Sequence, residues 1–242
     1  AYRWQRPGNI IHSGVQLMRY EFSGLQAATL KILLADMGFE YQRRWFISQK
    51  RVRHITKTRQ CGADWYFSLE ALIDAIETGR SQYFIAPGEG NSLSNNRQWM
   101  VHFARLAGVN IAPDDSAIRL TNGAEIQFIG EQHTLAACNG NAYVSEYAWA
   151  DKPANMFKVA KGISAHKNCR FTAYTSPSPS DEAYALWSSE KPDNQQRLSA
   201  YSALQQGSTI LNLPDIEAEF SKEDFNMLFS AIWPQENSEV AK

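Results

Sequence analysis

The stretch His54-Ile55-Thr56-Lys57-Thr58-Arg59-Gln60-Cys61-Gly62-Ala63-Asp64-Trp65 decides the fold. A β-branched run ends at Lys57, a polar turn with one glycine follows, and residues 65–76 have the apolar spacing of an amphipathic helix. A strand, a tight turn and a helix N-terminus form a cradle for anions, because free backbone N–H groups and the helix dipole point at the ligand. The usual phosphate loop reads G-x-x-x-x-G-K-[ST]. Here Gly62 is kept, Ala63 and Asp64 occupy the Lys and Ser/Thr positions, and the lysine stands at the front of the loop.

Composition places the chain among ordinary globular proteins. It has 242 residues, 44% of them apolar and 20% charged, and a net charge of −1. This charge excludes a global basic field, so any contact with DNA has to be local, for example at the Lys and Arg cluster between residues 43 and 59. Cys61, Cys138 and Cys169 lack metal-ligand spacing, which favours a reducing cytosolic compartment. No apolar run approaches the roughly 18 residues of a membrane span.

The rest of the chain alternates between helical and strand patterns. We expect helices at 21–36, 39–46, 65–76, 93–106, 154–162, 181–187 and 223–232, and strands at 52–56, 82–86, 117–120, 125–129, 141–145 and 170–175. Asn122-Gly123 predicts a hairpin, which is an antiparallel insertion in the plan. The alternation predicts a three-layer α/β fold with a mixed, mainly parallel central sheet. We expect a helical or irregular segment at 1–38, a core at 39–190 and a C-terminal appendage at 191–242.

Functional residues are expected where the strands end. In an open α/β sheet, ligands bind beyond the carboxyl ends of the strands. The loop Lys57–Asp64 follows the first strand, Glu146 follows strand 141–145, and Ser176-Pro177-Ser178 follows strand 170–175. A lysine can neutralise phosphate charge, and an acid at a neighbouring strand end can activate the attacking water. The layout is therefore that of a phosphate-loop nucleotidase.

Four blocks, in order over residues 39–190, resemble the ATPase domain of the large terminase subunit of tailed bacteriophages. The blocks are Tyr41-Gln42-Arg43-Arg44-Trp45, similar to Y-Q-x-x-W; residues 57–67, similar to K-S-R-Q-x-G-A-T-W-Y-F; residues 139–149, similar to G-N-V-Y-V-D-E-Y-F-W; and residues 172–178 with 182–187, similar to T-Y-F-S-T-P-S-S and E-A-Y-P-F-W. The resemblance implies a P-loop NTPase that uses ATP and Mg²⁺ to package double-stranded DNA into a procapsid.

The resemblance also implies roles for individual residues. Tyr41 and Gln42 would read the adenine, Glu146 would be the catalytic carboxylate, and Arg59 would stabilise charge on the γ-phosphate. The loop residues that would contact the nucleotide are Lys57, Thr58, Arg59, Gln60, Cys61, Gly62, Ala63, Asp64 and Trp65, and the motif that couples hydrolysis to DNA movement would be Thr175, Ser176 and Pro177. Without the resemblance, Tyr41 could simply pack in the core, Arg59 could pair with a surface acid, and Glu146 could cap a strand end.

Two positions depart from the family pattern. Asp64 stands where the family has the Thr or Ser ligand of Mg²⁺, and Ser145 stands where it has the Walker B Asp. Either the two ligand types are exchanged and still form one carboxylate–hydroxyl pair around Mg²⁺, or the site is decayed. In a decayed site Asp64 would face the phosphates as a like charge, which is unfavourable by about 1–4 kcal/mol at ~4 Å.

The resemblance implies partners as well. They are double-stranded DNA, a portal protein and a small terminase subunit, with the chain in a homo-oligomeric ring in the host cytoplasm, transiently at the procapsid portal, and with no membrane involved. Full-length family members carry a metal-dependent nuclease domain after the ATPase, and this sequence ends too soon to include it. Two alternatives stay open: a nucleotide-binding ring subunit with weakened turnover, which Asp64 and Ser145 favour, and a helicase-like translocase.

Overall fold

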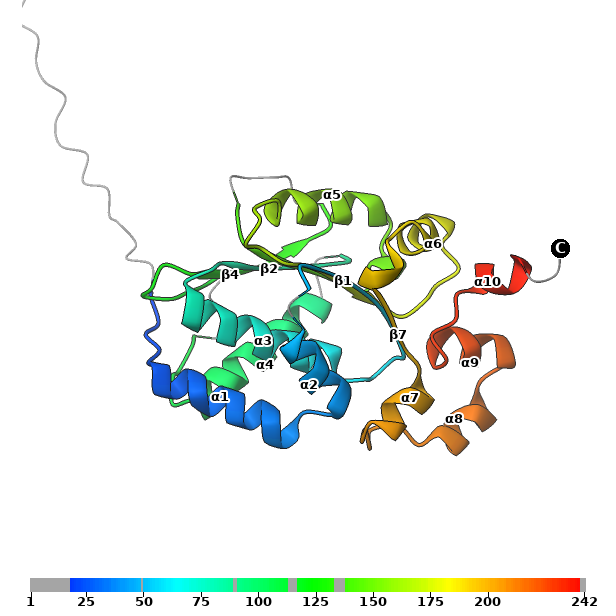
Figure 1. The fold of residues 1–242 in the computed structure, drawn as a ribbon, viewed down its shortest axis with the longest axis horizontal. Helices are drawn as coiled ribbons and strands as arrows, with labels where there is room; N and C mark the ends of the chain where they lie inside the picture. Colours follow the sequence, from blue (N-terminus) through cyan, green and yellow to red (C-terminus); the bar gives the residue numbers. More distant parts are fainter. Residues whose placement is uncertain (1–17, 49, 89–90, 113–116, 133–137, 240–242) are drawn as a thin grey trace, which may run out of the picture.

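A single sheet forms the centre of the molecule. The computed structural model describes residues 18–48, 50–88, 91–112, 117–132 and 138–239. Within these ranges seven strands lie in the order β3-β4-β2-β5-β6-β1-β7 (Figure 1), and only the pair β3–β4 is antiparallel. The predicted mixed, mainly parallel sheet is thus confirmed. The strands are β1 (Val52–Lys57), β2 (Gln82–Ala86), β3 (Ala117–Arg119), β4 (Glu125–Gly130), β5 (Asn141–Ser145), β6 (Phe171–Thr175) and β7 (Gln195–Leu198).

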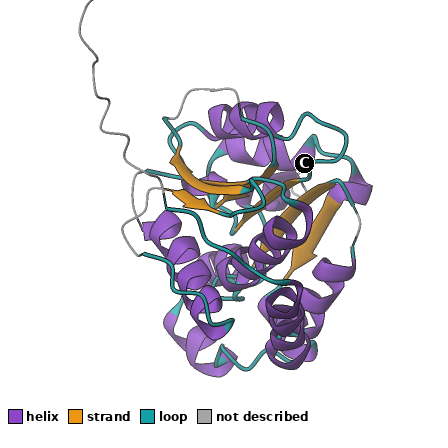
Figure 2. Ribbon diagram, turned by 90° about the vertical axis from the view of Figure 1, so that its left-hand side faces the viewer, coloured by secondary structure: helices purple, strands orange, loops and turns teal. Residues whose placement is uncertain are grey.

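Helices cover both faces of this sheet, which gives the three predicted layers (Figure 1 and Figure 2). One face is covered by α1 (Gly24–Met37), α2 (Glu40–Ile47), α3 (Ala63–Thr78) and α4 (Asn91–Leu106). The other face is covered by α5 (Pro153–Ile163) and α6 (Asp181–Ser188), and the single turn η1 (Tyr147–Trp149) lies between β5 and α5 in the chain. Because helices lie on both sides, every residue of β2, β5 and β6 is buried. None of the described helices has the length and apolar character needed to cross a membrane.

The C-terminal quarter is built from short helices beside β7. They are η2 (Pro192–Asn194), α7 (Ala200–Gln205), α8 (Leu213–Glu219), α9 (Lys222–Leu228) and α10 (Pro234–Glu239). Helices α7 to α9 enclose a small core of their own around Leu213 and Phe229. Trp233, just before α10, is instead fully buried in the core under α5 and α6, where its indole N–H donates to Thr56 Oγ1 at 3.2 Å. The segment is therefore tied to the main sheet as well as to itself.

The structure differs from the sequence-based expectation mainly in this quarter. The sequence predicted no strand beyond residue 190, but the edge strand β7 of the sheet comes from that part of the chain and runs parallel to β1. Its sequence Gln-Gln-Arg-Leu buries only Leu198 fully, so no apolar alternation marks it as a strand. The helix expected at 223–232 ends earlier, at Leu228, and Ala231 within the expected range has a φ of 58°, which a right-handed helix does not allow. The division of the chain into three parts stays a prediction, and residues 1–17 lie outside the described ranges.

A buried ion pair ties β1 to α3. The Arg53 guanidinium donates to both carboxylate oxygens of Glu70, at 2.8 and 2.6 Å, and also to Thr172 Oγ1 on β6. The hydroxyls of Tyr66 and Tyr143 donate to the same carboxylate at 2.5 and 3.1 Å. Burial favours the neutral acid, but Arg53, the nearby Arg170 and the Tyr66 hydroxyl outweigh it and lower the pKa of Glu70. The carboxylate is therefore ionised and fully hydrogen-bonded inside the protein.

A second buried polar group, His54, lies on the opposite face of β1. Its ring is enclosed by Tyr147, Phe157 and Trp187, and its Nε2 lies 2.6 Å from the Tyr147 hydroxyl. Nδ1 has no hydrogen-bond partner within the described part of the chain. Burial is the main reason that the pKa of His54 is lowered from 6.5 to about 4; Glu190 opposes this shift and Lys161 adds to it. The imidazole is therefore neutral in the folded protein near neutral pH.

We expect Glu70→Gln to lower the free energy of unfolding by about 3–5 kcal/mol, because Arg53 then stays buried without its counter-charge. Denaturant titration of the variant measures this loss. Glu217→Gln, on the exposed side of α8, is the matched control and should change stability by less than about 0.5 kcal/mol. Equal stability of the two variants would contradict the role given to the ion pair.

We expect the free energy of unfolding to fall as pH drops from 6.5 to 4, through protonation of His54. Between these pH values His54 is protonated in the unfolded chain but neutral in the native protein, so a lower pH favours unfolding. At pH 4 this lowers the free energy of unfolding by about 3 kcal/mol. Denaturant titrations of wild type and His54→Gln at both pH values isolate this contribution. The variant should lose less stability than wild type over the window, and parallel losses would show that His54 does not titrate as described.

Candidate functional site

The loop between β1 and α3 has the geometry of a phosphate loop. Lys57 is the last residue of β1, residues 58–62 form the turn, and α3 begins at Ala63. Gly62 precedes the helix in the left-handed conformation, with φ 68°, and Gln60 also has a positive φ of 54°. A side chain at Gly62 would be strained, and its Cβ would lie 3.0 Å from Gln42 Nε2. Glycine is therefore required where the backbone turns into the helix.

The turn is held from behind by the first residues of α2. The Tyr41 hydroxyl donates to the carbonyl of Cys61 at 2.7 Å, and Gln42 Nε2 donates to the carbonyl of Gly62 at 3.1 Å. Both side chains are almost fully buried. They fix the shape of the loop and do not line the cavity in front of it. Their predicted contact with adenine stays a prediction, while their contact with the loop is a role that the sequence did not indicate.

The front of the turn is held by the C-terminal quarter. The amide of Thr58 donates to the carbonyl of Leu198 at 2.7 Å, and the amide of Arg59 donates to the carbonyl of Leu228 at 2.9 Å. The first two amides of the loop are thus occupied by β7 and α9. The amides that remain at the N-terminus of α3 are those that a helix start offers to an anion.

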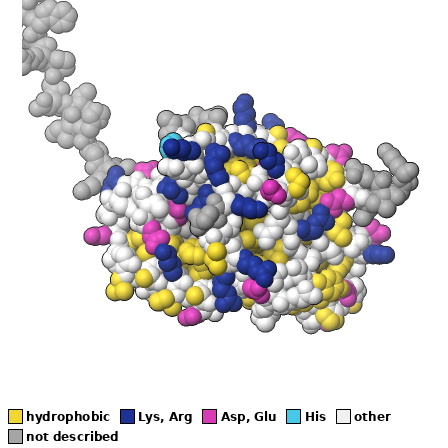
Figure 3. Space-filling model, viewed as in Figure 1, with side chains coloured by type: hydrophobic (Ala, Val, Ile, Leu, Met, Phe, Trp, Pro, Cys, Tyr) yellow, Lys and Arg dark blue, Asp and Glu magenta, His cyan; other side chains and the backbone are white. Residues whose placement is uncertain are grey.

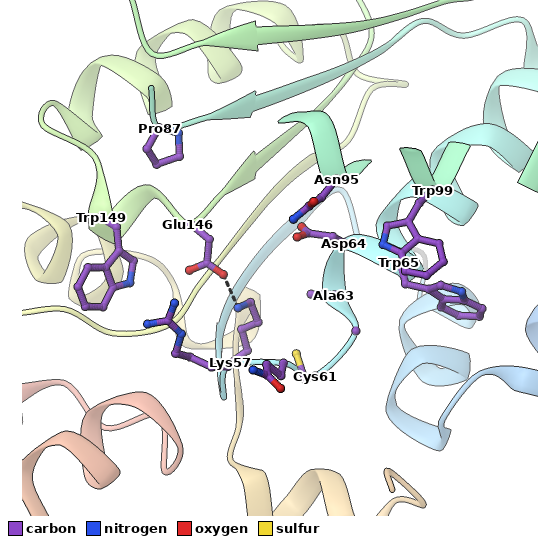
Figure 4. Close-up of a pocket in the computed structure, with 13 residues that line it drawn as sticks. Lys57, Cys61, Ala63, Asp64, Trp65, Pro87, Asn95, Trp99, Glu146 and Trp149 are labelled. Carbon is purple, nitrogen blue, oxygen red and sulfur yellow. Dashed lines mark hydrogen bonds and ion pairs between the residues drawn. The ribbon is translucent and has the colours of Figure 1, made fainter. Parts of the chain in front are cut away.

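A cavity of about 590 Å³ opens in front of the loop (Figure 4). Its volume suits a nucleotide-sized ligand. Of the loop residues that we predicted, all except Thr58 line it: Lys57, Arg59, Gln60, Cys61, Gly62, Ala63, Asp64 and Trp65. The remaining walls are Glu146 and Trp149 from the end of β5, and Pro87, Asn95 and Trp99 from the region of β2 and α4. Sequence reasoning missed these last three, since they belong to no motif.

An ion pair closes one end of this cavity. Lys57 Nζ donates to Glu146 Oε1, and the side chains are 6% and 26% exposed. Glu146 Oε2 accepts from the amide and the hydroxyl of Ser176, both at 3.1 Å, and from Thr175 Oγ1 at 3.4 Å. Burial opposes charge on both partners, but their mutual attraction outweighs it, so the pKa of Lys57 is raised and that of Glu146 lowered. Both groups are charged, and Glu146 has an ionised carboxylate that can accept a proton.

The backbone of Glu146 is itself strained. Its φ is 47°, in the left-handed region that a glutamate rarely adopts. Such strain persists only where the surroundings enforce it, and it is concentrated at functional sites. Here the hydrogen bonds from Ser176 and Thr175 enforce it. Pro177 follows Ser176 and does not line the cavity, so a coupling role for Thr175, Ser176 and Pro177 stays a prediction.

The two positions that depart from the family pattern meet at the same corner. The Tyr174 hydroxyl donates to Asp64 Oδ1 at 2.9 Å, and Ser145 is the register partner of Tyr174 on the neighbouring strand. Burial disfavours the charged carboxylate and raises the pKa of Asp64, and the nearby Lys57 ammonium offsets part of this rise. Ser145 Oγ is buried and makes no hydrogen bond of normal geometry within the described ranges. These ranges hold no group of three or more His, Cys, Asp or Glu side chains fit for a metal. A cation here would need Asp64, Ser145 and oxygens of the ligand.

The chain resembles known phage proteins in sequence. The family model "Terminase large subunit, T4likevirus-type, N-terminal" matches residues 54–230. The terminase ATPase subunit of Escherichia phage P2 is 29% identical over 252 residues, which cover 90% of this chain and 42% of that protein. The chain therefore spans less than half the length of this relative.

Solved structures share the fold. The large terminase ATPase domain of Thermus phage P74-26, in a mutant form, superimposes with a TM-score of 0.61 at 12% identity, over 79% of this chain and 92% of that one. The large terminase of a thermophilic bacteriophage, solved in complex with ADP, has a TM-score of 0.61 at 11% identity, over 81% and 53% of the two chains. The family model covers most of the sequence, including the loop, Glu146 and Ser176, and the chain belongs to the family of T4likevirus-type terminase large subunits, in their N-terminal region.

Proposed function

We propose that this chain binds ATP in the cavity and hydrolyses it as the motor domain of a phage terminase. The observation that carries the proposal is the meeting of Lys57 and Glu146 at one end of a cavity floored by a helix N-terminus. A cation for phosphate and an ionised carboxylate for water are the two groups that phosphoryl transfer to water requires. The name of the P2 relative, an ATPase subunit, and the ADP bound to the terminase of the thermophilic bacteriophage support it.

The residues suggest how hydrolysis proceeds. The amides at the start of α3 and the Lys57 ammonium bind the phosphates, and phosphate oxygens compete with Glu146 for Lys57. Glu146 then stays fixed through Ser176, with one oxygen available to a water molecule. As the water oxygen bonds to the γ-phosphorus, its proton passes to Glu146 and the bond to the β–γ bridging oxygen breaks. Arg59, at the mouth of the cavity, stabilises the charge that develops on the γ-phosphate.

Mg²⁺ fits the donor set at the Asp64 corner. Asp64 supplies a carboxylate, and Ser145 supplies a buried hydroxyl that makes no hydrogen bond of normal geometry in the described chain. Oxygen donors of these types are those that Mg²⁺ prefers. When bound, the ion would neutralise charge on the phosphate oxygens. We therefore favour the exchanged carboxylate–hydroxyl pair, in which Tyr174 holds Asp64 in place.

Packaging of double-stranded DNA into a procapsid is the process that we infer for the whole protein. Residues 152–167 contain four lysines and no acidic residue, and Figure 3 shows Lys and Arg gathered on the part of the surface where α5 lies. Such a local basic region suits the DNA backbone although the net charge of the chain is −1. Assembly as a ring with a portal protein and a small terminase subunit, in the host cytoplasm, and transmission of hydrolysis through Thr175, Ser176 and Pro177 complete the proposal.

A nucleotide-binding ring subunit with weakened turnover is the second candidate. Asp64 favours it, because the raised pKa shows that burial already disfavours its charge, and phosphates would add to that cost. Such a subunit would bind ATP and retain it without releasing phosphate.

We expect phosphate release by the wild-type chain, measured with and without double-stranded DNA, to fall by about 10²-fold or more in Glu146→Gln, which removes the proton acceptor. Lys57→Ala should weaken binding of labelled ATP, while Glu146→Gln should leave that binding intact. Glu217→Gln, exposed on α8, serves as the control and should match wild type. Binding of ATP without phosphate release in wild type would select the weakened subunit.

We expect the double variant Asp64→Thr with Ser145→Asp to keep both turnover and Mg²⁺ binding, since it moves the carboxylate to the strand and the hydroxyl to the loop. The single variant Asp64→Thr should lose both, because it leaves two hydroxyls and no carboxylate at the corner. The shift in melting temperature that Mg²⁺ adds to the effect of ADP provides a readout besides activity. A double variant faster than wild type would instead identify a decayed site.

A further inference from the structure

Trp149 is the side chain at this site whose contacts the proposed chemistry leaves unexplained. It ends the turn η1, and its amide donates to the carbonyl of Glu146 at 3.0 Å. The indole is 45% exposed and lies beside Glu146, at the end of the cavity away from Trp65 and Trp99 (Figure 4).

The edge of the indole is bonded to Ser176. Trp149 Nε1 donates to Ser176 Oγ at 3.1 Å and to the Ser176 carbonyl at 3.2 Å. An indole N–H can only donate, and a hydroxyl has a single proton. Since Ser176 Oγ accepts from Trp149, its own proton is left for Glu146 Oε2, 3.1 Å away. The indole therefore sets the direction of a chain of hydrogen bonds that ends on the Glu146 carboxylate.

The guanidinium of Arg59 lies over the face of the same indole. The Arg59 Cζ lies 5.8 Å from the ring centroid, within the range of about 6 Å for a cation–π contact. Arg59 makes no ion pair in the described part of the molecule. Its guanidinium is thus placed at the cavity mouth by an aromatic surface, which restrains it without neutralising it.

We propose that Trp149 is a positioning residue for the hydrolysis inferred above, on which this proposal rests. Its N–H orients the Ser176 hydroxyl toward Glu146, and its ring face holds the Arg59 guanidinium beside the cavity. One side chain thereby aligns three segments that are distant in sequence: the loop after β1, the end of β5 and the end of β6. A residue that only filled space would tolerate replacement by phenylalanine. In the proposed role the ring face and the indole N–H make different contacts, so loss of the N–H alone should have an effect.

Two substitutions separate the two contacts. Trp149→Phe keeps a ring for Arg59 and removes the donor to Ser176, so kcat should fall by about tenfold while KM stays within about twofold. Trp149→Leu removes both contacts and should also raise KM. Melting temperatures of both variants show whether the losses follow stability instead. Tyr201→Phe, which alters an exposed aromatic side chain on α7, is the control and should keep the wild-type kcat.

A double-mutant cycle with Ser176→Ala tests whether Trp149 acts through Ser176. If it does, Trp149→Phe with Ser176→Ala should be no slower than the slower single variant, because both changes break the same chain. Losses that multiply, or a wild-type kcat in Trp149→Phe, overturn the proposal.

A fluorescence measurement keeps the test independent of turnover. Trp149 emission, obtained as wild type minus Trp149→Phe, should change when the non-hydrolysable analogue adenylyl imidodiphosphate draws Arg59 toward its γ-phosphate, and should not change in Arg59→Ala. If wild type releases no phosphate, the hydrolysis proposal fails, and this emission change still decides the Trp149–Arg59 contact. An emission that the analogue leaves unchanged overturns the role of the ring face.

Discussion

The bidentate pair between Arg53 and Glu70 is the constraint on which the site depends. It joins the start of β1 to the middle of α3, so the strand and the helix that flank the phosphate loop cannot shift against each other. Burying two charges is costly unless their geometry and remaining hydrogen bonds are nearly complete, as they are here. The loop at 58–62 then connects two fixed ends, and it makes the required turn through left-handed backbone conformations at Gln60 and Gly62.

The order of the strands brings the functional side chains together at this fixed loop. Strand β6 lies between β1 and β5, and neighbouring strands are about 4.8 Å apart, so Lys57 and Glu146 start about 10 Å from each other. A lysine and a glutamate side chain together span that gap. The strand between them ends at Thr175, and Thr175 and the following Ser176 hold the second carboxylate oxygen. The intervening strand therefore determines how the acid faces the cavity.

The sequence predicted the elements that carry a strong apolar signal. Strands β2, β5 and β6 are short, largely apolar runs bounded by turn residues, β1 is rich in β-branched residues, and α3 follows a glycine-marked turn. Their positions could therefore be predicted without tertiary information. Strand β7 could not, because its sequence is polar and it pairs only with β1; helices α7 and α8 are too short for a clear helical period and are held by a small core of their own. The Asn122-Gly123 hairpin was confirmed, since its turn chemistry is local.

The same distinction holds for the site. Lys57 ends a strand and Glu146 and Ser176 each follow one, and the rule that ligands bind at strand ends predicted that they lie together before the fold was known. The contacts of Trp149 with Arg59 and of Tyr174 with Asp64 depend on the register between strands, which no single segment encodes. Tyr41 and Gln42 were expected to read the adenine, which stays a prediction, and only the structure shows that they donate to carbonyl groups of the loop.

The position of β1 in the sheet also has a consequence for the order in which the chain can fold during synthesis. Its two neighbours, β6 and β7, are made 114 or more residues later, and the Trp233 that bonds to Thr56 comes 177 residues after it. At roughly 5–20 residues per second, β1 waits on the order of 10 s on the ribosome with both edges unpaired. The strand that carries the phosphate-binding lysine is thus the one most exposed to wrong partners before the molecule is complete.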